Sequence, residues 1–484
     1  MIQKMPLKER IGLRMKLLRK DGNSGINVPM LLLLAVGVIE FLFICLESLF
    51  SGVGYYLAET YLIVPCLLFL GYVLQEKQST FARRRLLLAV AAASWFVIVQ
   101  CIHKIQGMEN HPMATVFFVY LMAFPFAALT DDRENQGFWW IGGMFVTASL
   151  VLVFYTLLLM MNLVPAGLEK YIFWDGARLH AMWHPNINAC YFMIGIGFSA
   201  AFCARADKSW KKGLLLIFIV VQFLAMALTN CRTVLLVTGA LLGGIVFFRI
   251  FRGNWKQFLL GLAAAAVLLV SSFKLSGMLF QWNNDRLLAS VSIAQQETLT
   301  EETLSEETLA EEAHAEEISN ETGAVVEEST GVLMGDNWQG TLAHDMRTLN
   351  GRTHIWKGAL MAIRDSKALA LWGTEYSGTV ISVYSPIPVV HGHNSWVEAL
   401  MRMGLPGLAL SLVFTAISIW SAAKLALNRN TELWKKIIAI TAMCILIAGF
   451  LEPYLFITNV YYHVTDFIFF FLTGYLDLWA NRAK

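Results

Sequence analysis

The feature that most constrains this chain is a series of apolar segments of about 17 to 24 residues, each long enough for an α-helix to cross a hydrocarbon core of roughly 30 Å. Because lipid offers no hydrogen-bond partners, such a segment must satisfy its own backbone polar groups, as a helix does. Composition agrees, since 57% of the 484 residues are hydrophobic and only 15% are charged, with a mean hydropathy of +0.57. The sequence therefore predicts an all-α membrane protein surrounded by membrane lipids.

We expect twelve transmembrane helices, nine within residues 30–273 and three within residues 396–484. One large polar segment, residues 274–395, separates span nine from span ten. The apolar signal is weakest for the fourth and sixth spans. In chain order the expected spans cover residues 30–48, 55–74, 86–102, 113–130, 138–161, 188–204, 213–229, 233–250, 257–273, 404–423, 437–456 and 459–480.

Basic residues gather at alternate ends of these spans, which sets the expected orientation. Loops rich in Lys and Arg remain in the cytoplasm. We therefore expect both termini inside, residues 1–29 as a basic cytoplasmic segment and residues 274–395 outside. No small-residue cleavage site follows the first span, so it is expected to be an anchor and not a removed signal peptide. The basic clusters include Arg83 to Arg85, Arg205 with Lys208, Lys211 and Lys212, Arg249 with Arg252, and Lys435 with Lys436.

The seven cysteines lie in or beside the expected spans, and the outer segment has none. Their spacing matches no zinc site and predicts no disulfide framework.

The outer segment contains an acidic repeat. Residues 296–320 form five imperfect pentapeptides, QETLT, EETLS, EETLA, EEAHA and EEISN, and twelve glutamates with no Lys or Arg lie between Glu297 and Glu328. Such like-charge density resists compaction. We expect residues 296–328 to be a disordered or loosely helical insert without a catalytic role, with cation binding as the sharper alternative.

The rest of the outer segment carries helix signals. Apolar spacing after Gly351 predicts a helix that starts at Arg352. Ser395 followed by Glu398 has capping-box spacing, which predicts a second helix start just after His393 and Asn394. An ionisable histidine where a polar loop re-enters the bilayer is a candidate functional residue.

The segment from His393 to Gly407, HNSWVEALMRMGLPG, resembles the signature of the O-antigen ligase and O-antigen polymerase superfamily. In that signature a histidine and a small polar residue are followed, after nine residues, by a glycine and a second small residue three positions on. Gly404 and Gly407 match these last two positions and are expected to be structural; we expect Gly404 to end the helix and Pro406 to open the next.

Three further elements and the layout of spans support the same resemblance. The superfamily has twelve spans and one large outer loop between the ninth and tenth. Its sequence elements are matched by Gly351-Arg352-Thr353-His354-Ile355-Trp356, by Asn230-Cys231-Arg232-Thr233, and by residues 178–186, RLHAMWHPN, where Ala181 replaces a glycine.

The resemblance implies a glycosyltransferase of the bacterial inner membrane. Such an enzyme moves a glycan from a polyprenyl-diphosphate-linked oligosaccharide to an acceptor glycan or lipid on the outer face. Arginine suits the diphosphate because its fork binds phosphate oxygens and stays charged, so Arg232 and Arg352 are the expected diphosphate ligands. The acceptor hydroxyl needs a base that is neutral near pH 7, which points to His393. His391 is the alternative base.

Weaker candidates for substrate binding are Arg178, His184, Asn186 and Asn394. We expect no cofactor and no essential metal, because fixed cations can stabilise the leaving charge and the outer face has no Asp-x-Asp motif.

Several readings stay open. A polymerase is favoured, with ligase-type transfer of finished glycan to a lipid, wall polymer or protein as the alternative. A lipid-linked oligosaccharide flippase also suits twelve spans, but two comparable halves would be expected there. A structural or sensor protein with a partner-binding acidic loop would leave His393 and the arginines unexplained. No nucleic-acid partner is expected.

Overall fold

The computed structural model describes residues 28–46, 80–108, 135–251, 254–312, 351–386, 389–456 and 463–482. The second and fourth expected spans, the basic N-terminal segment and the last part of the acidic insert lie outside these residues. Statements about structure below concern the described part of the chain.

The described chain is mostly helical, and each expected span that falls within it overlaps a helix. Eight of these helices are long and apolar enough to cross a membrane, whereas the count of twelve spans stays a prediction. The eight are α5 (Thr80–Ile105), α8 (Gln136–Met160), α9 (Pro185–Arg205), α10 (Ser209–Leu228), α11 (Arg232–Ile250), α12 (Trp255–Glu312), α17 (Ser395–Leu427) and α18 (Leu433–Leu451).

Two further helices belong to the bundle. In α2 (Val28–Cys45), the apolar stretch Met30–Cys45 is shorter than in the eight. In α19 (His463–Arg482), Asp466 and Asp477 lower the apolar character, yet residues 467–472 are fully buried. Because α19 is enclosed by other helices, its polar residues are shielded from lipid.

Helix α9 is the other enclosed helix, and glycine lets its neighbours approach. A Cβ added at Gly197 would lie 2.4 Å from Thr441 Oγ1 on α18. Small residues allow such close approach where lipid leaves no hydrophobic drive between helices. Helices α9 and α18 thus pack tightly, and both end at the site described below.

The mostly helical structure agrees with the expected all-α class, to which it adds one antiparallel hairpin, β1 (Ile172–Asp175) with β2 (Arg178–Ala181), where Asp175 lies opposite Arg178. Two expected boundaries need correction. Helix α18 ends at Leu451, five residues before the expected end of span eleven. Helix α12 does not end near residue 273 but continues to Glu312.

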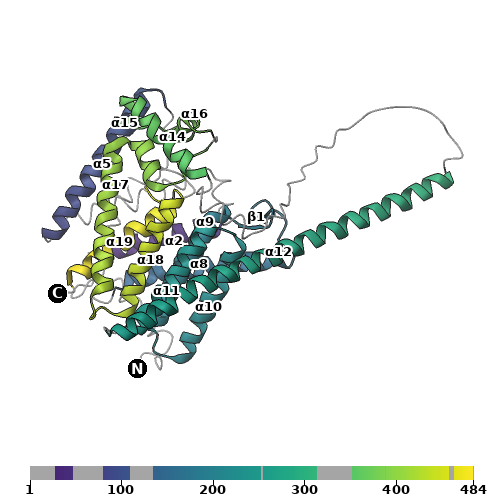
Figure 1. The fold of residues 1–484 in the computed structure, drawn as a ribbon, viewed down its shortest axis with the longest axis horizontal. Helices are drawn as coiled ribbons and strands as arrows, with labels where there is room; N and C mark the ends of the chain where they lie inside the picture. Colours follow the sequence, from purple (N-terminus) through teal and green to yellow (C-terminus); the bar gives the residue numbers. More distant parts are fainter. Residues whose placement is uncertain are drawn as a thin grey trace.

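The length of α12 sets it apart in Figure 1, where it leaves the bundle as a rod. Its 58 residues correspond to about 87 Å at 1.5 Å per residue. The first three acidic pentapeptides, residues 296–310, therefore belong to a continuous helix. Of the two expected states of the insert, disordered or loosely helical, this part is helical.

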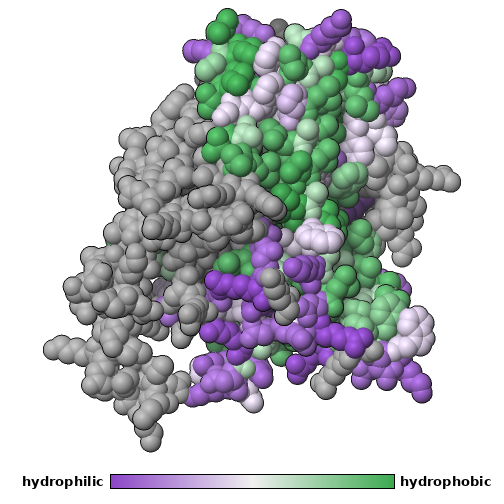
Figure 2. Space-filling model, turned by 90° about the vertical axis from the view of Figure 1, so that its left-hand side faces the viewer, coloured by the Kyte–Doolittle hydropathy of each residue, from purple (hydrophilic) through white to green (hydrophobic). Residues whose placement is uncertain are grey.

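Three short helices form a cap over the start of α17: α14 (Arg352–Asp365), α15 (Lys367–Trp372) and α16 (Ser377–Tyr384). Figure 1 shows them at the upper end of the bundle, away from the α9–α10 and α17–α18 connections. The face in Figure 2 has hydrophobic residues along the helices and hydrophilic residues gathered at the lower end. The bundle therefore has an apolar belt between two polar ends.

Candidate active site at the upper end of the bundle

The loop before α17 presents His393 in a constrained backbone conformation. His393 has a φ of 47°, in the left-handed region that non-glycine residues seldom adopt. Among the described residues, Met182, Asn230 and Phe456 also have positive φ and lie in segments beside the same site. Backbone strain of this kind persists where the surroundings enforce it, often at functional sites.

Helix α17 starts just after His393 and Asn394, as expected, but its N-cap is Asn394 and not Ser395, so the expected capping box with Glu398 is wrong. The Asn394 side-chain oxygen accepts hydrogen bonds from the backbone N–H groups of Trp396 and Val397, and its Nδ2 donates to Phe450 O at 2.7 Å. Glu398 does not reach back to the cap. Because Asn394 is buried and its amide is occupied by these bonds, it fixes the position of the preceding His393.

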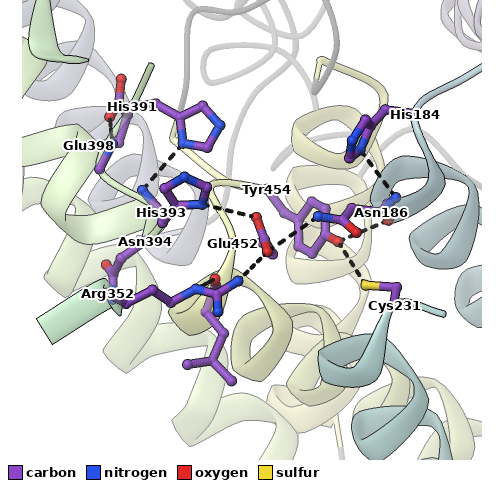
Figure 3. Close-up of polar contacts among 12 residues, drawn as sticks. His184, Asn186, Cys231, Arg352, His391, His393, Asn394, Glu398, Glu452 and Tyr454 are labelled. Atoms are coloured by element: carbon purple, nitrogen blue, oxygen red, sulfur yellow. Dashed lines mark hydrogen bonds and ion pairs between the residues drawn. The ribbon is translucent and has the colours of Figure 1, made fainter. Parts of the chain in front are cut away.

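Glu452 lies at the centre of the site, immediately after α18. Its Oε1 accepts from Arg352 Nη2 at 2.5 Å, and its Oε2 lies 3.7 Å from His393 Nδ1, slightly beyond hydrogen-bond length. Arg352 Nε also donates to Leu451 O at 2.8 Å. Arg352 is the first residue of α14, as expected. Figure 3 shows His393 and Arg352 approaching the same carboxylate from the cap side.

The opposite side of Glu452 is formed by the start of α9. Asn186 Nδ2 donates to Glu452 Oε1 at 3.3 Å, and Asn186 Oδ1 accepts from Arg178 Nη2 at 2.7 Å. Arg178 also donates from Nε to Thr229 O. His184 caps α9 by accepting from Asn186 N–H. The hairpin and the α9 start therefore bring Arg178, His184 and Asn186 to the site.

The start of α11 completes the cluster. The Tyr454 hydroxyl donates to Asn186 O at 2.9 Å, and Cys231 Sγ lies 4.0 Å from the same hydroxyl. Arg232 follows Cys231 directly, is half-buried and is the first residue of α11. The cluster thus unites chain segments near residues 180, 230, 350, 390 and 450.

Burial and the neighbouring charges shift the pKa of Glu452 in opposite directions. Burial alone would raise the pKa of Glu452, but the interaction with His393 and the charge of Arg352 outweigh it and hold this pKa below the usual range. Burial, and then the neighbouring His393, lowers the pKa of His391. Burial also lowers the pKa of His184, with Arg178 contributing. The surroundings therefore favour the anionic form of Glu452, whereas burial disfavours the protonated forms of His391 and His184.

His393 is more accessible than its partners. A third of its side chain is exposed (33%), against 5% for Glu452. The ring of His391 lies 4.2 Å from that of His393 between centroids, and His391 Nδ1 accepts from His393 N–H. An imidazole that is one-third exposed and backed by a buried carboxylate has the arrangement of a general base and its orienting group.

A second buried ionic network supports this loop from behind. Glu398 Oε2 accepts from Gly392 N–H at 2.8 Å, and Glu398 Oε1 accepts from Arg402 Nε at 2.6 Å. Arg402 Nη1 donates to Glu375 Oε2, and Glu375 Oε1 lies 3.2 Å from His103 Nδ1 on α5. The loop that carries His393 is therefore tied to a transmembrane helix through two carboxylates and an arginine.

The two motif glycines occupy crowded positions. Gly404 has φ 68° and interrupts α17, as expected of a helix break, and an added Cβ would lie 2.2 Å from Leu371 O. At Gly407 an added Cβ would lie 2.1 Å from Met403 Cβ. Pro406 opens the helical segment after the break. Gly404 therefore lets α15 of the cap rest directly on α17, whereas at Gly407 the crowding comes from Met403 of α17 itself.

Sequence reasoning missed Glu452 and gave Glu398 only a capping role, although the sequence contains a signal for the observed contacts of each. Glu452 precedes Pro453 at the edge of an apolar run, where a carboxylate is costly and therefore informative. Glu398 and Arg402 have the i, i+4 spacing of a helical ion pair. Within the described residues, no group of three or more His, Cys, Asp or Glu side chains could hold a metal ion.

Comparison with known proteins gives one family. The model of the O-antigen ligase family matches residues 214–412, a segment that includes Arg232, Arg352 and His393 and ends before Glu452. No curated protein matches the chain.

Proposed function

We propose that this chain, whose residues 214–412 match the O-antigen ligase family, transfers a glycan from a polyprenyl-diphosphate-linked donor to an acceptor hydroxyl. One observation carries the proposal: His393, one-third exposed, lies beside buried Glu452. The segments that form this site also contain Arg178, Arg232 and Arg352. In this proposal the reaction takes place on the outer face of the bacterial inner membrane, and the expected cytoplasmic location of the basic loops supports this orientation.

His393 acts as the base in this proposal. With Glu452 ionised, the Nδ1 proton of His393 faces the carboxylate, so Nε2 is the basic nitrogen. Nε2 takes the proton of the acceptor hydroxyl as its oxygen bonds to the anomeric carbon. The bond from that carbon to the diphosphate oxygen breaks, and the electron pair leaves with the diphosphate. Glu452 stabilises the imidazolium that forms.

In this proposal the arginines stabilise the negative charge that develops on the leaving diphosphate. Arg232 and Arg352 are the proposed diphosphate ligands, since guanidinium groups remain charged and bind two oxygens at once. Arg178 donates a hydrogen bond to the Asn186 side chain and adds a third positive charge to this region. Fixed positive charge in a partly dry site stabilises a leaving anion without reorganising, so we propose that transfer needs no metal or cofactor.

We propose a polymerase, which joins one lipid-linked repeat unit to another. A ligase uses the same donor chemistry and differs in the acceptor, so the same site serves either reaction. For Asn394 we now propose a positioning role and not substrate contact, because its buried amide is bonded to the backbone.

The test compares glycans in cells that carry the intact gene, a deletion, or His393→Ala, resolved by length on a gel stained for polysaccharide. Single repeat units accumulating on lipid would establish a polymerase, and long chains remaining on their carrier would establish a ligase. Loss of a general base removes about 10²- to 10⁴-fold of rate, so His393→Ala should match the deletion.

The matched control is His354→Ala, which removes an exposed histidine of α14 in the same cap and should leave glycan lengths unchanged. Donor binding to purified protein should survive His393→Ala and weaken in Arg352→Ala. Normal glycans from the His393→Ala strain would remove His393 from the role of base, and His391→Ala would then be the decisive variant.

A further inference from the structure

A polar cavity lies at the end of the bundle opposite the candidate active site. It has a volume of about 290 Å³ and is formed by the end of α11 and the α17–α18 connection. Helices α11 and α18 each have 19 residues, which corresponds to about 28 Å, and both run from this cavity to the candidate active site. The cavity is therefore separate from the catalytic centre by the thickness of the apolar belt.

Three cations line this cavity: Arg249, Arg429 and Lys436. None of its described lining residues is acidic. In the described part of the chain none of the three forms an ion pair, whereas neighbouring Lys435 is paired with Glu432 at 2.9 Å. Glu432 is thus engaged by a cation that does not line the cavity, and the three lining cations have no counter-ion among the described residues.

An unpaired hydroxyl points to the same conclusion. Thr431 lines the cavity, and its Oγ1 is buried with no hydrogen-bond partner among the described residues. Buried polar groups are normally hydrogen-bonded. An anion that bears several oxygens would satisfy this hydroxyl and the cations together, and a phosphate group has both the charge and the acceptors.

The apolar residues that line the cavity indicate whether the phosphate group belongs to a soluble molecule or to a lipid. Phe248, Phe251, Leu427 and Leu433 share the cavity with the cations, and Leu427 is 81% exposed at the end of α17. Apolar side chains beside a cationic cavity, where apolar helices end, suit a molecule with a phosphate head and acyl chains. We propose that this cavity binds the phosphate head group of an anionic phospholipid, in the leaflet opposite the active site.

The test measures thermal unfolding of the purified full chain in neutral detergent, with added phosphatidylglycerol, phosphatidylcholine or glycerol phosphate. Phosphatidylglycerol should raise the unfolding temperature more than phosphatidylcholine does, and glycerol phosphate alone should have little effect. The difference should shrink by at least half in Arg249→Gln/Lys436→Gln. Added salt should weaken the phosphatidylglycerol effect because the contact is ionic.

Lys435→Gln is the matched control, since Lys435 is a neighbouring cation already paired with Glu432; it should respond to lipid as the unmodified chain does. Arg429→Gln tests the cavity separately if the double variant unfolds. An equal rise with both phospholipids, or an undiminished rise in Arg249→Gln/Lys436→Gln and in Arg429→Gln, would overturn the proposal. A full response to glycerol phosphate would overturn the lipid assignment.

Discussion

The two polar ends of the bundle hold their cations differently. At the upper end two partly buried arginines pair with buried carboxylates, Arg352 with Glu452 and Arg402 with Glu398 and Glu375. At the lower end Arg249, Arg429 and Lys436 face a cavity with no acidic lining residue among those described.

This difference separates two uses of charge. A buried ion pair is costly to desolvate and adds little net stability, but removing one partner leaves an uncompensated charge. Such pairs therefore fix geometry, as Glu398 does when it binds Gly392 N–H beside His393. Unpaired cations at a polar edge keep their hydration and remain available to an external anion. We infer that the ion pairs of the upper end position the loop that carries His393, whereas the cations of the lower end attract an external anion.

The largest expected effect is on Arg402→Ala. It would leave Glu398 and Glu375 buried without their shared counter-ion, which costs about 3–5 kcal/mol. We expect a large drop in the unfolding temperature of purified protein, followed by tryptophan fluorescence, together with loss of glycan transfer in cells.

Arg364→Ala is the control, because Arg364 pairs with Asp365 on the exposed surface and its loss should not change the unfolding temperature measurably. An Arg402→Ala protein as stable as the unmodified chain would show that the upper network has no positioning role.

A second expected effect concerns Glu452→Gln, which keeps the shape of the side chain but removes its charge. His393 loses the anion that orients it and stabilises its protonated form, so turnover should fall about 10- to 100-fold, or about 1.4–2.7 kcal/mol. Single-turnover transfer and donor binding on the same preparation separate the effects, since donor binding should change less.

Tyr454→Phe is the matched change in the same turn, because it removes only the hydroxyl that donates to Asn186 O, and it should retain most of the turnover. Equal losses in the two variants would mean that Glu452 only maintains the turn.

The sequence was sufficient to predict local features, but it did not predict which side chains contact one another across the fold. Apolar runs predicted the described helices, because each helix in lipid must satisfy its own backbone. The Gly351-Arg352 signal predicted the start of α14, and Gly404 predicted the break in α17. Each of these follows from a few consecutive residues.

Glu452 shows why the rest was not predictable. It lies 100 positions from Arg352 and 266 from Asn186 along the chain, so its role depends on tertiary packing. The same limit explains the capping error at Ser395: Asn394 and Ser395 both suit an N-cap, and the contact of Asn394 with Phe450 O decides between them. The assigned roles of His393, Arg232 and Arg352 stay predictions until tested.

A smaller effect should appear on acidification. The pKa values of Glu452 and Glu375 are both held below the usual glutamate range, in spite of burial, by His393 with Arg352 and by His103 with Arg402. A carboxylate with a lowered folded pKa contributes stability above its unfolded pKa and loses it as pH falls through the folded value. Unfolding temperature should therefore fall below about pH 4.3, the ordinary glutamate value.

The acid dependence also separates the two ends. Glu375→Gln should show a shallower fall between pH 5 and pH 3, because one titrating group is gone, whereas Arg249→Gln should keep the slope of the unmodified chain. An equally steep fall in Glu375→Gln would assign the acid sensitivity to other carboxylates.

The smallest effect is expected for Arg429→Ala in neutral detergent without lipid. Arg429 is exposed and has no ion pair in the described part of the chain, so its removal leaves no buried charge uncompensated, and the change should be within about 0.5 kcal/mol. The measurement is the unfolding temperature beside that of Arg402→Ala on the same day and in the same detergent. If Arg429→Ala destabilised the protein as strongly as Arg402→Ala, Arg429 would have an internal partner, and the lower cavity would be a structural network like the upper one. If it is neutral in detergent and loses stabilisation only when phosphatidylglycerol is present, the two arginines differ as inferred: Arg402 stabilises the fold through its carboxylate partners, whereas Arg429 binds an external anion.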